Sequence, residues 1–402
     1  MAIKVGLLLF LVCTTLIPIG RGLAETVIDV TKFGAKPNGK VDSTMGPCTA
    51  SKRMTVEIQG TLIADNDISA YTSFYWIMFE HVDNVVVTGG GTINGRGEAV
   101  WKFDAGEKIQ NAPLLPVSLV FQGVRNSALH HLNFVNSKGF HLKITDSSGI
   151  NVSHLRITAP GNSPNTDGIH ISETTNIKVT NSVIQTGDDC VSIGDGNNNV
   201  IVSGIKCGPG HGISIGSIGK RPDEKSVKGV RVSNCTLTGT TNGARIKTYR
   251  ASPKLQVSSI IFENLILKNV KRPIIIDQDY NSKNKIQPSN VKIRDVHFKN
   301  IRGTISSSKN AVMLTCSESN PCQGIEFANI DIRPSSSARG LLPTSCVNVK
   351  PIFKGKAEPN EETKHEHVSI ITNVSSWIVD QQRAMLDHIL NITITLQFRA
   401  RN

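Results

Sequence analysis

The chain has 402 residues, a net charge of +12 and only 5% aromatic residues, with 34 glycines. So few aromatic side chains argue against a core built on large rings and favour β-branched residues in short, stacked strands. The basic excess indicates a polyanionic partner, but nucleic acid is disfavoured because no run of Lys and Arg is interleaved with aromatics. The length suits a single domain if the fold is a solenoid, which grows without a thicker core.

The first segment, residues 1–24, has the layout of a secretory signal peptide. Lys4 precedes an apolar run, and Gly22 and Ala24 supply the small residues of a cleavage site. The run is too short to span a bilayer, and Pro18 interrupts it. We therefore expect a secreted, extracellular protein that keeps no membrane anchor once this segment is removed.

A repeat of about 25 residues follows, in which an Asn precedes alternating apolar residues and then Gly, Asn and Ser turns. Repeats begin at Asn126, Asn151, Asn176 and Asn199, at intervals of 25, 25 and 23 residues. None contains a helical pattern. Short strands at a fixed spacing predict an all-β, parallel β-helix with Asn side chains stacked at one corner. A two-sheet sandwich also has evenly spaced strands, but it does not need the same turn residue in each unit.

Polar side chains recur at one corner of successive repeats. They are Asn165, Asp167, Asp188, Asp189, His211, Arg245, Lys247 and Tyr280. Since adjacent coils lie about 4.8 Å apart, we expect them to form one cluster. Alone, an Asp-Asp pair is usually a solvated turn and a single His is usually structural. Together, three repelling carboxylates supply a proton donor beside an acceptor, as glycosidic cleavage requires, and the two cations can hold an acidic sugar.

Five blocks resemble the signature segments of the polygalacturonases, glycoside hydrolase family 28. They are SPNTDGIHI, TGDDCVSIG, CGPGHGISIGS, NGARIKT and PIIIDQDY, in the order and spacing of that family. The resemblance implies a right-handed parallel β-helix that hydrolyses the α-1,4-galacturonosyl linkages of pectin with inversion. It also implies no metal or other cofactor, a monomer, and a place in the cell wall. The sequence is similar to those of plant members, particularly those of the pollen-type group, which are exopolygalacturonases.

The resemblance assigns the catalytic roles to four residues. Asp188 is the expected general acid. Asp167 and Asp189 are expected to activate the attacking water. His211 is expected to share in the protonation network of the acid.

The resemblance assigns substrate contacts to four further residues. Arg245 and Lys247 are expected to bind the galacturonate carboxylate. Tyr280 is expected to line the subsite, and Asn165 to orient its neighbours.

Two disulfides are expected among the eight cysteines, of which Cys13 lies in the leader. Cys190 and Cys207 are 17 residues apart, about one coil without a corner, so they can face each other on neighbouring strands. Cys316 and Cys322 enclose a short turn. The family resemblance supports both pairs. The remaining cysteines, for which we expect no partner, are Cys48, Cys235 and Cys346.

The resemblance predicts a β-helix domain over residues 25–365, with two departures from the family. Near residues 44–45, VDST runs directly into MGPC, where the family has a further helix and coil. Residues 366–402 form a divergent tail without family features. These departures keep open a second hypothesis, a pectin-binding protein of the same fold without catalysis.

A third hypothesis is a pectate lyase, which is also a β-helix protein. The carboxylates of Asp167, Asp188 and Asp189 are oxygen ligands of the kind that bind Ca²⁺. The signature blocks argue against this hypothesis. The sequence does not distinguish exo action at the ends of the polysaccharide from endo action within it.

Overall fold

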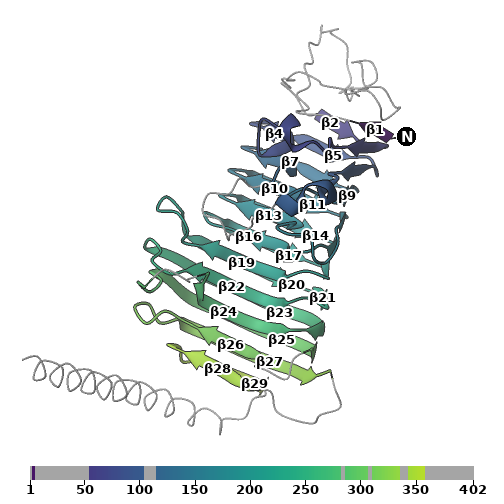
Figure 1. Cartoon of the computed structure of the whole chain (residues 1–402). Helices are drawn as coiled ribbons and strands as arrows, with labels where there is room; N and C mark the ends of the chain where they lie inside the picture. Colours follow the sequence, from purple (N-terminus) through teal and green to yellow (C-terminus); the bar gives the residue numbers. More distant parts are fainter. Residues whose placement is uncertain are drawn as a thin grey trace, which may run out of the picture.

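A computed structural model of the chain describes residues 2–4, 54–103, 115–281, 286–306, 310–335 and 343–357. In this part of the chain, short parallel strands wind into stacked coils, from the purple N-terminal end to the yellow C-terminal end of Figure 1. The only helical elements described are single turns of 3₁₀ helix, η2 (Ile68–Ala70), η3 (Gly97–Ala99) and η4 (Trp101–Phe103). Among the described residues, no helix has the length and apolar character to cross a bilayer.

The first sheet has ten strands, one from each successive coil. They are β4 (Tyr75–Glu80), β7 (Val117–Gln122), β10 (Leu142–Thr145), β13 (Ile169–Ser172), β16 (Asp189–Ile193), β19 (Gly212–Ile218), β22 (Asn242–Tyr249), β24 (Arg272–Tyr280), β26 (Val312–Thr315) and β28 (Thr344–Val347). All neighbours pair in parallel.

The second sheet has nineteen strands in two rows that merge toward the C-terminus. One row contains β2 (Met54–Glu57), β5 (Val85–Thr88), β8 (Ala128–His130), β11 (Ser148–Ser153), β14 (Thr175–Thr180), β17 (Asn198–Ser203) and β20 (Val227–Ser233). The other contains β1 (Ala2–Lys4), β3 (Thr61–Ile63), β6 (Thr92–Asn94), β9 (Asn133–Val135), β12 (Arg156–Thr158), β15 (Val183–Gln185), β18 (Lys206–Cys207) and β21 (Thr236–Thr238). The merged strands are β23 (Leu255–Val270), β25 (Val291–Ile305), β27 (Gln323–Pro334) and β29 (Ile352–Ala357).

The core is a stack of equivalent inward positions, because parallel register places the same face of each strand above the last. One column of the ten-stranded sheet consists of Ile144, Ile171, Ile193, Ile215, Ile246 and Ile276. Every member of this column is completely buried. Branched aliphatic side chains suit such columns, since they are stiff and pack well on a pleated surface. This arrangement confirms the fold class expected from the repeat.

Side-chain ladders run along the coils on both sides of the nineteen-stranded sheet. Inside, four phenylalanine rings stack with centroids 5.0 to 5.5 Å apart, and the rings belong to Phe262, Phe298, Phe327 and Phe353. At an outer corner, consecutive amide groups of one asparagine ladder are 3.0 to 3.1 Å apart, and its members are Asn234, Asn264, Asn300 and Asn329. Each of these asparagines has a left-handed φ, which Asn tolerates better than most residues.

The expected stacking of repeat-initiating asparagines is wrong for one member. Asn199 donates to Asn176 at 2.6 Å, as a ladder requires. Asn151, however, lies within β11 and pairs with Lys178, so Gly149 occupies the corner position of that coil. A glycine adopts the same positive φ without a side chain.

Several expectations fall on residues outside the described part of the chain. They concern the leader over residues 1–24 apart from β1, the missing segment near residues 44–45, Cys48 and the tail over residues 366–402. The strand β1 pairs in parallel with β3.

We predict that Phe298→Ala lowers the free energy of unfolding by about 3–5 kcal/mol, because it leaves a cavity between two stacked rings. Denaturant unfolding monitored by circular dichroism measures the change. Lys299→Ala, at a neighbouring and partly exposed position, is the control, with an expected effect within about 0.5 kcal/mol. Equal effects of the two substitutions would contradict a continuous ring stack.

Candidate active site

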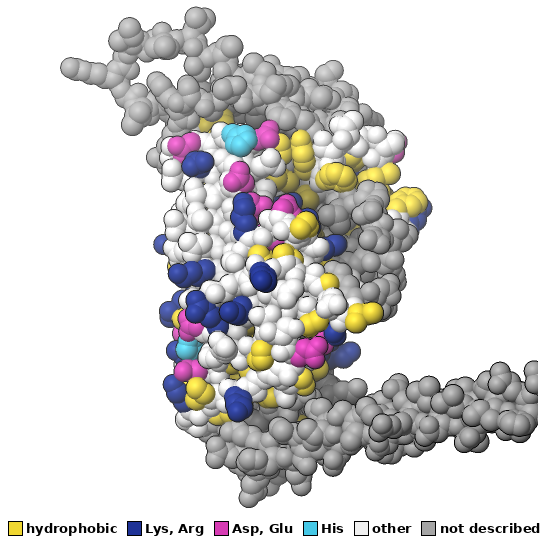
Figure 2. All heavy atoms as spheres, turned by 90° about the vertical axis from the view of Figure 1, so that its left-hand side faces the viewer, with side chains coloured by type: hydrophobic (Ala, Val, Ile, Leu, Met, Phe, Trp, Pro, Cys, Tyr) yellow, Lys and Arg dark blue, Asp and Glu magenta, His cyan; other side chains and the backbone are white. Residues whose placement is uncertain are grey.

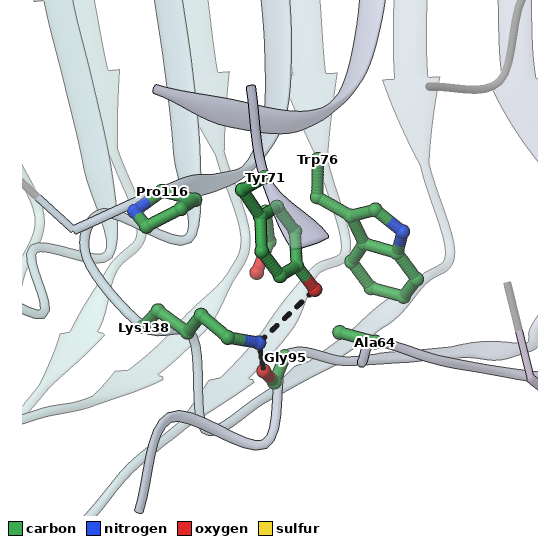
Figure 3. Close-up of a pocket in the computed structure, with 7 residues that line it drawn as sticks. Ala64, Tyr71, Trp76, Gly95, Pro116 and Lys138 are labelled. Carbon is green, nitrogen blue, oxygen red and sulfur yellow. Dashed lines mark hydrogen bonds between the residues drawn. The ribbon is translucent and has the colours of Figure 1, made fainter. Parts of the chain in front are cut away.

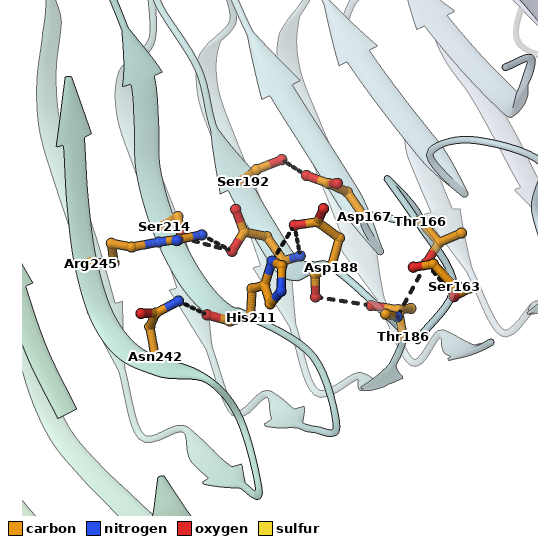
Figure 4. Close-up of polar contacts among 12 residues, drawn as sticks. Ser163, Thr166, Asp167, Thr186, Asp188, Ser192, His211, Ser214, Asn242 and Arg245 are labelled. Carbon is orange, nitrogen blue, oxygen red and sulfur yellow. Dashed lines mark hydrogen bonds and ion pairs between the residues drawn. The ribbon is translucent and has the colours of Figure 1, made fainter. Parts of the chain in front are cut away.

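The predicted polar residues gather on five neighbouring strands in the middle of the ten-stranded sheet. Asp167 precedes β13 by two residues, and Asp189 begins β16 and pairs with Gly212 of β19. The bulge in this pairing re-aims the start of β16. Arg245 and Lys247 project from β22, and Tyr280 ends β24. Figure 4 shows Asp167, Asp188, His211 and Arg245 converging from these elements.

Asp188 is the most accessible of the three carboxylates. Its side chain is 19% exposed, compared with 1% for that of Asp189. Oδ1 accepts hydrogen bonds from Nδ1 of His211 at 2.9 Å and from the backbone N–H of Asp189 at 2.7 Å. Oδ2 has no hydrogen-bond partner among the described residues. One carboxylate oxygen of Asp188 is therefore fixed by hydrogen bonds, and the other can contact a substrate.

Asp189 is the centre of the buried charges. Its Oδ1 accepts from Arg245 at 2.7 Å and from the hydroxyl of Ser214 at 2.8 Å, and its Oδ2 accepts from Lys247 at 3.1 Å. Burial alone raises the pKa of this carboxyl, but the charges of Arg245 and Lys247 outweigh burial and lower the pKa to about 2. Asp189 is therefore ionised at any physiological pH.

Asp167 lies in the opposite electrostatic environment. Burial raises its pKa well above the usual range, and the charges of Asp188 and Asp189 raise it further. The hydroxyl of Ser192 donates to Oδ2 at 2.6 Å and opposes this rise, as does the charge of Lys247. The three carboxylates therefore have separate environments, as a proton donor beside acceptors requires.

Hydrogen bonds within the turns hold the carboxylates in place. The hydroxyl of Thr166 accepts from the backbone N–H of Gly187 at 3.1 Å and lies 2.6 Å from that of Ser163, which links the turns before β13 and β16. Gly210 has a φ of 135°, and a Cβ there would lie 2.5 Å from the carbonyl oxygen of Asp188. The glycine before His211 is thus required for the close approach of two turns.

Arg245 and Lys247 keep hydrogen-bond donors for a ligand. Arg245 uses Nε on Ser214 and Nη2 on Asp189, and Lys247 makes one hydrogen bond, also to Asp189. Within the described residues, Nη1 of Arg245 has no hydrogen-bond partner. Two cations against one carboxylate also leave a net positive charge, which suits a substrate anion.

Of the two remaining predicted substrate residues, Tyr280 lies beside this pair, whereas Asn165 lies three coils away, before β13. The ring of Tyr280 lies 5.0 Å from Nζ of Lys247 and packs edge-on against Tyr249. Asn165 lies in the turn two residues before Asp167, is half-buried and has a left-handed φ of 47°.

Both expected disulfides are present. Cys190 and Cys207 have Cα atoms 5.9 Å apart, and Cys316 and Cys322 have Cα atoms 5.7 Å apart. The first bridge ties β16, which carries Asp189, to β18. Cys235 is a buried free thiol whose pKa burial raises to about 11, so it remains protonated and unreactive.

Three side chains near the site are close enough to share a metal ion, but each already makes hydrogen bonds within the protein. One ligand atom each from Asp188, Asp189 and His211 lie within 4.8 Å of one another. Both oxygens of Asp189 already accept hydrogen bonds from cations or a hydroxyl, and His211 directs Nδ1 at Asp188. Protein cations therefore already compensate the charge that a divalent ion would neutralise.

The net positive charge of the chain lies mainly outside the site. Several exposed basic residues lie on strands of the nineteen-stranded sheet, with no ion pair within the described part of the chain: Arg156, Lys178, Lys206, Lys228, Lys268, Lys292, Arg294 and Arg302. On the side seen in Figure 2, Lys and Arg side chains are interspersed with Asp and Glu. A polyanion is therefore attracted by the molecule as a whole, and the site supplies only the local contacts.

Another buried cation, Lys138, is structural. Its Nζ donates to the carbonyl oxygen of Gly95 at 2.6 Å and to the hydroxyl of Tyr71 at 3.2 Å, and it lies 4.7 Å from the Tyr71 ring (Figure 3). Burial lowers its pKa to about 8. With Pro116 and Trp76 beside it, this lysine ties early coils together.

Three polar residues that support the site were not predicted from the sequence. Ser192 contacts Asp167, Ser214 contacts Asp189, and the amide of Asn242 donates to the carbonyl oxygen of His211 at 3.0 Å. Ser192 and Ser214 stand three residues after Asp189 and His211, on outward positions of β16 and β19. This repeated spacing is the signal that could have identified them.

Comparison with known proteins gives consistent matches over most of the chain. Residues 26–357 match the family described as Glycosyl hydrolases family 28. An exopolygalacturonase of Arabidopsis thaliana is 42% identical over 84% of this chain and 89% of its own length. A polygalacturonase of Gossypium hirsutum is 39% identical over 82% of this chain and 89% of its own length.

Solved structures agree on the fold. The endo-xylogalacturonan hydrolase of Aspergillus tubingensis superposes with a TM-score of 0.65 and 25% identity, covering 75% of this chain and 86% of that one. An exopolygalacturonase of Thermotoga maritima gives a TM-score of 0.66 at 18% identity, covering 81% of this chain and 91% of that one.

We predict that Asp189 makes folding pH-dependent in the acid range. Its folded-state pKa of about 2 lies below the value of about 3.9 for an unfolded Asp, so its ionisation stabilises the fold above the unfolded value. This contribution, on the order of 2–3 kcal/mol, is lost as the pH falls toward the folded-state pKa. The free energy of unfolding, measured from about pH 7 to pH 2, should therefore fall less steeply below pH 4 in Asp189→Asn than in the wild type.

The control for this measurement is Asp331→Asn, which alters a partly exposed carboxylate of the other sheet. Its acid dependence should match that of the wild type. An Asp189→Asn profile that also matches the wild type would refute the stabilising role of the ionised carboxylate.

Proposed function

The chain belongs to family 28 of the glycosyl hydrolases, and from this we propose that it is a polygalacturonase that uses its three clustered aspartates as acid and base. It hydrolyses the α-1,4-galacturonosyl linkages of pectin. The observation that carries the assignment of roles is the make-up of the cluster. Asp189 is ionised, burial disfavours the anion of Asp167, and the exposed Asp188 lies beside them, so that one proton is available to Asp167 and Asp188.

The proposed acid is Asp188. Carboxyls in each other's field titrate together, so a proton belongs to the cluster rather than to one residue. Arg245 and Lys247 keep Asp189 ionised, which leaves that proton to Asp167 and Asp188. Asp188 holds the free oxygen Oδ2, from which the proton passes to the glycosidic oxygen as the C1–O4 bond breaks. His211 steadies the other oxygen of Asp188 through Nδ1.

The proposed acceptors are Asp167 and Asp189. With the proton on Asp188, both are anions, and they orient a water whose oxygen bonds to C1 on the side opposite the leaving group. The water proton passes to this pair, and the configuration at C1 inverts. No metal is required in this scheme, because Arg245 and Lys247 already balance the charge of Asp189.

Arg245 and Lys247 are the proposed contacts of the galacturonate carboxylate, through Nη1 of Arg245 and the remaining N–H groups of Lys247. Tyr280 borders this position from β24, and Asn165 is proposed to orient its neighbours in the turn before β13. Residues 1–24 are the proposed secretion leader, and residues 366–402 are a proposed tail beyond the β-helix. The proposed location of the enzyme is the cell wall, and its proposed oligomeric state is a monomer.

The decisive experiment is the product profile of the purified secreted protein on polygalacturonate. Monomer alone indicates exo action, and a ladder of oligomers indicates endo action. Binding without new reducing ends would support a non-catalytic pectin-binding protein instead. An unsaturated product that absorbs in the near ultraviolet and disappears with a chelator would support a lyase.

We predict that Asp188→Asn lowers kcat by a factor of about 10² or more, because the amide has no proton of suitable acidity to donate. KM should change little. Reducing-end release from polygalacturonate measures both. Asp331→Asn is the matched control and should retain wild-type kinetics, whereas near-normal turnover by Asp188→Asn would exclude it as the acid.

We predict that Arg245→Ala and Lys247→Ala each raise KM for polygalacturonate, because each removes donors aimed at the substrate carboxylate. Added salt should raise the KM of the wild type by screening the same attraction. Lys268→Ala, on the other sheet, is the control for loss of one positive charge. A KM that responds to neither substitution nor salt would contradict carboxylate recognition at this position.

A further inference from the structure

A series of hydrogen bonds leads from Oδ2 of Asp167 through Ser192 to His170. Ser192 Oγ lies 2.6 Å from Oδ2 of Asp167 and 2.8 Å from Nδ1 of His170. Ser192 projects from β16 and His170 from the adjacent β13, where the register pairs the two residues directly. The contact between Ser192 and His170 therefore depends on the sheet and not on a loop.

The number of protons on the Ser192 hydroxyl determines the direction of these two hydrogen bonds. The Ser192 hydroxyl has one proton, and an ionised Asp167 can only accept it. Nδ1 of His170 must then donate to the serine oxygen. Burial lowers the pKa of His170 to about 3, so the ring is neutral and has its single proton on Nδ1.

The packing around His170 keeps the ring in this position. The Phe140 ring stacks on it with centroids 4.9 Å apart, and Ser192 is buried. The charged groups that act on the ring are Lys143 on β10, Lys247 on β22, Asp189 on β16 and Arg221 in the turn after β19. Those that act on Asp167 are Asp188, Asp189 and Lys247.

We propose that His170 is a positioning residue for the Asp167 carboxylate and acts on it through the hydroxyl of Ser192. Two ordered donations, from His170 to Ser192 and from Ser192 to Asp167, stabilise the anion of Asp167. The proton shared by the cluster is thereby directed to Asp188, the residue that donates it. This inference rests on the proposed function, since it adds a residue to the same acid–base pair.

The kinetic test uses His170→Phe, which keeps a ring against Phe140 and removes the donor. Without the relay, Asp167 competes better for the shared proton, so kcat should fall roughly ten- to hundredfold while KM is unchanged. The acid limb of the pH profile of kcat should move to higher pH, because the carboxylate that must be ionised has lost a stabilising donor. His170→Asn, which restores an N–H near the position of Nδ1, should recover part of the rate.

A double-mutant cycle separates a relay from general damage to the site. If His170 acts only through Ser192, His170→Phe should have no further effect in the Ser192→Ala background. Independent, multiplying effects of the two substitutions would overturn the proposal. His154→Phe, which alters a ring stacked on His131 at a corner of the other sheet, is the control and should leave the kinetics unchanged.

A second measurement needs no substrate and so separates failure of this proposal from failure of the proposed function. In protein labelled with ¹⁵N-histidine, the signals of His170 are identified by their loss in His170→Phe. We expect a neutral ring with the proton on Nδ1 from about pH 5 to pH 8. A proton on Nε2, or protonation near the ordinary pKa of about 6.5, would overturn the relay even if the wild type hydrolyses polygalacturonate.

Discussion

The parallel register between successive coils is the constraint on which every other feature depends. It places each outward side chain of the ten-stranded sheet next to its equivalent one coil away, at the spacing of neighbouring strands. Asp167 and Asp189 therefore belong to adjacent coils, with Ser214 and Arg245 on the following two. The inward residues of the same strands form the buried isoleucine column, so the apolar core that stabilises the coils also aligns the proposed catalytic groups.

Within this frame, the buried ion cluster around Asp189 organises the charges. A buried carboxylate is costly unless it is paired, and the pairing here comes from two cations of one strand, Arg245 and Lys247. The two cations suit an anionic sugar, and in the proposed mechanism the fixed negative charge of Asp189 leaves one proton to its two neighbouring carboxyls. The proposed substrate recognition and acid–base chemistry therefore use the same set of interactions.

In the proposed mechanism, supporting groups decide which carboxyl in that cluster holds the proton. Asp188 has His211 and a backbone N–H on one oxygen, whereas Asp167 has Ser192 with His170 behind it. The disulfide between Cys190 and Cys207 and the bonded turns at Thr166 and Gly187 restrict movement of the carboxylates. The site is thus held by β-strands and short turns, which suits a reaction that depends on the separation of fixed carboxyls.

The β-helix, both disulfides and the gathering of the predicted polar residues on one sheet could be predicted from the sequence, because a repeat with period-two strands places equivalent residues on neighbouring coils. The sequence did not determine which partner each side chain meets. Asn151 was assigned to the wrong corner, and the contacts between Asp189 and Arg245, 56 residues apart, and between Ser192 and His170 went unseen. Turn lengths differ from coil to coil, so counting along the chain loses the register. Only backbone pairing between coils restores it and decides which outward side chains share a hydrogen bond.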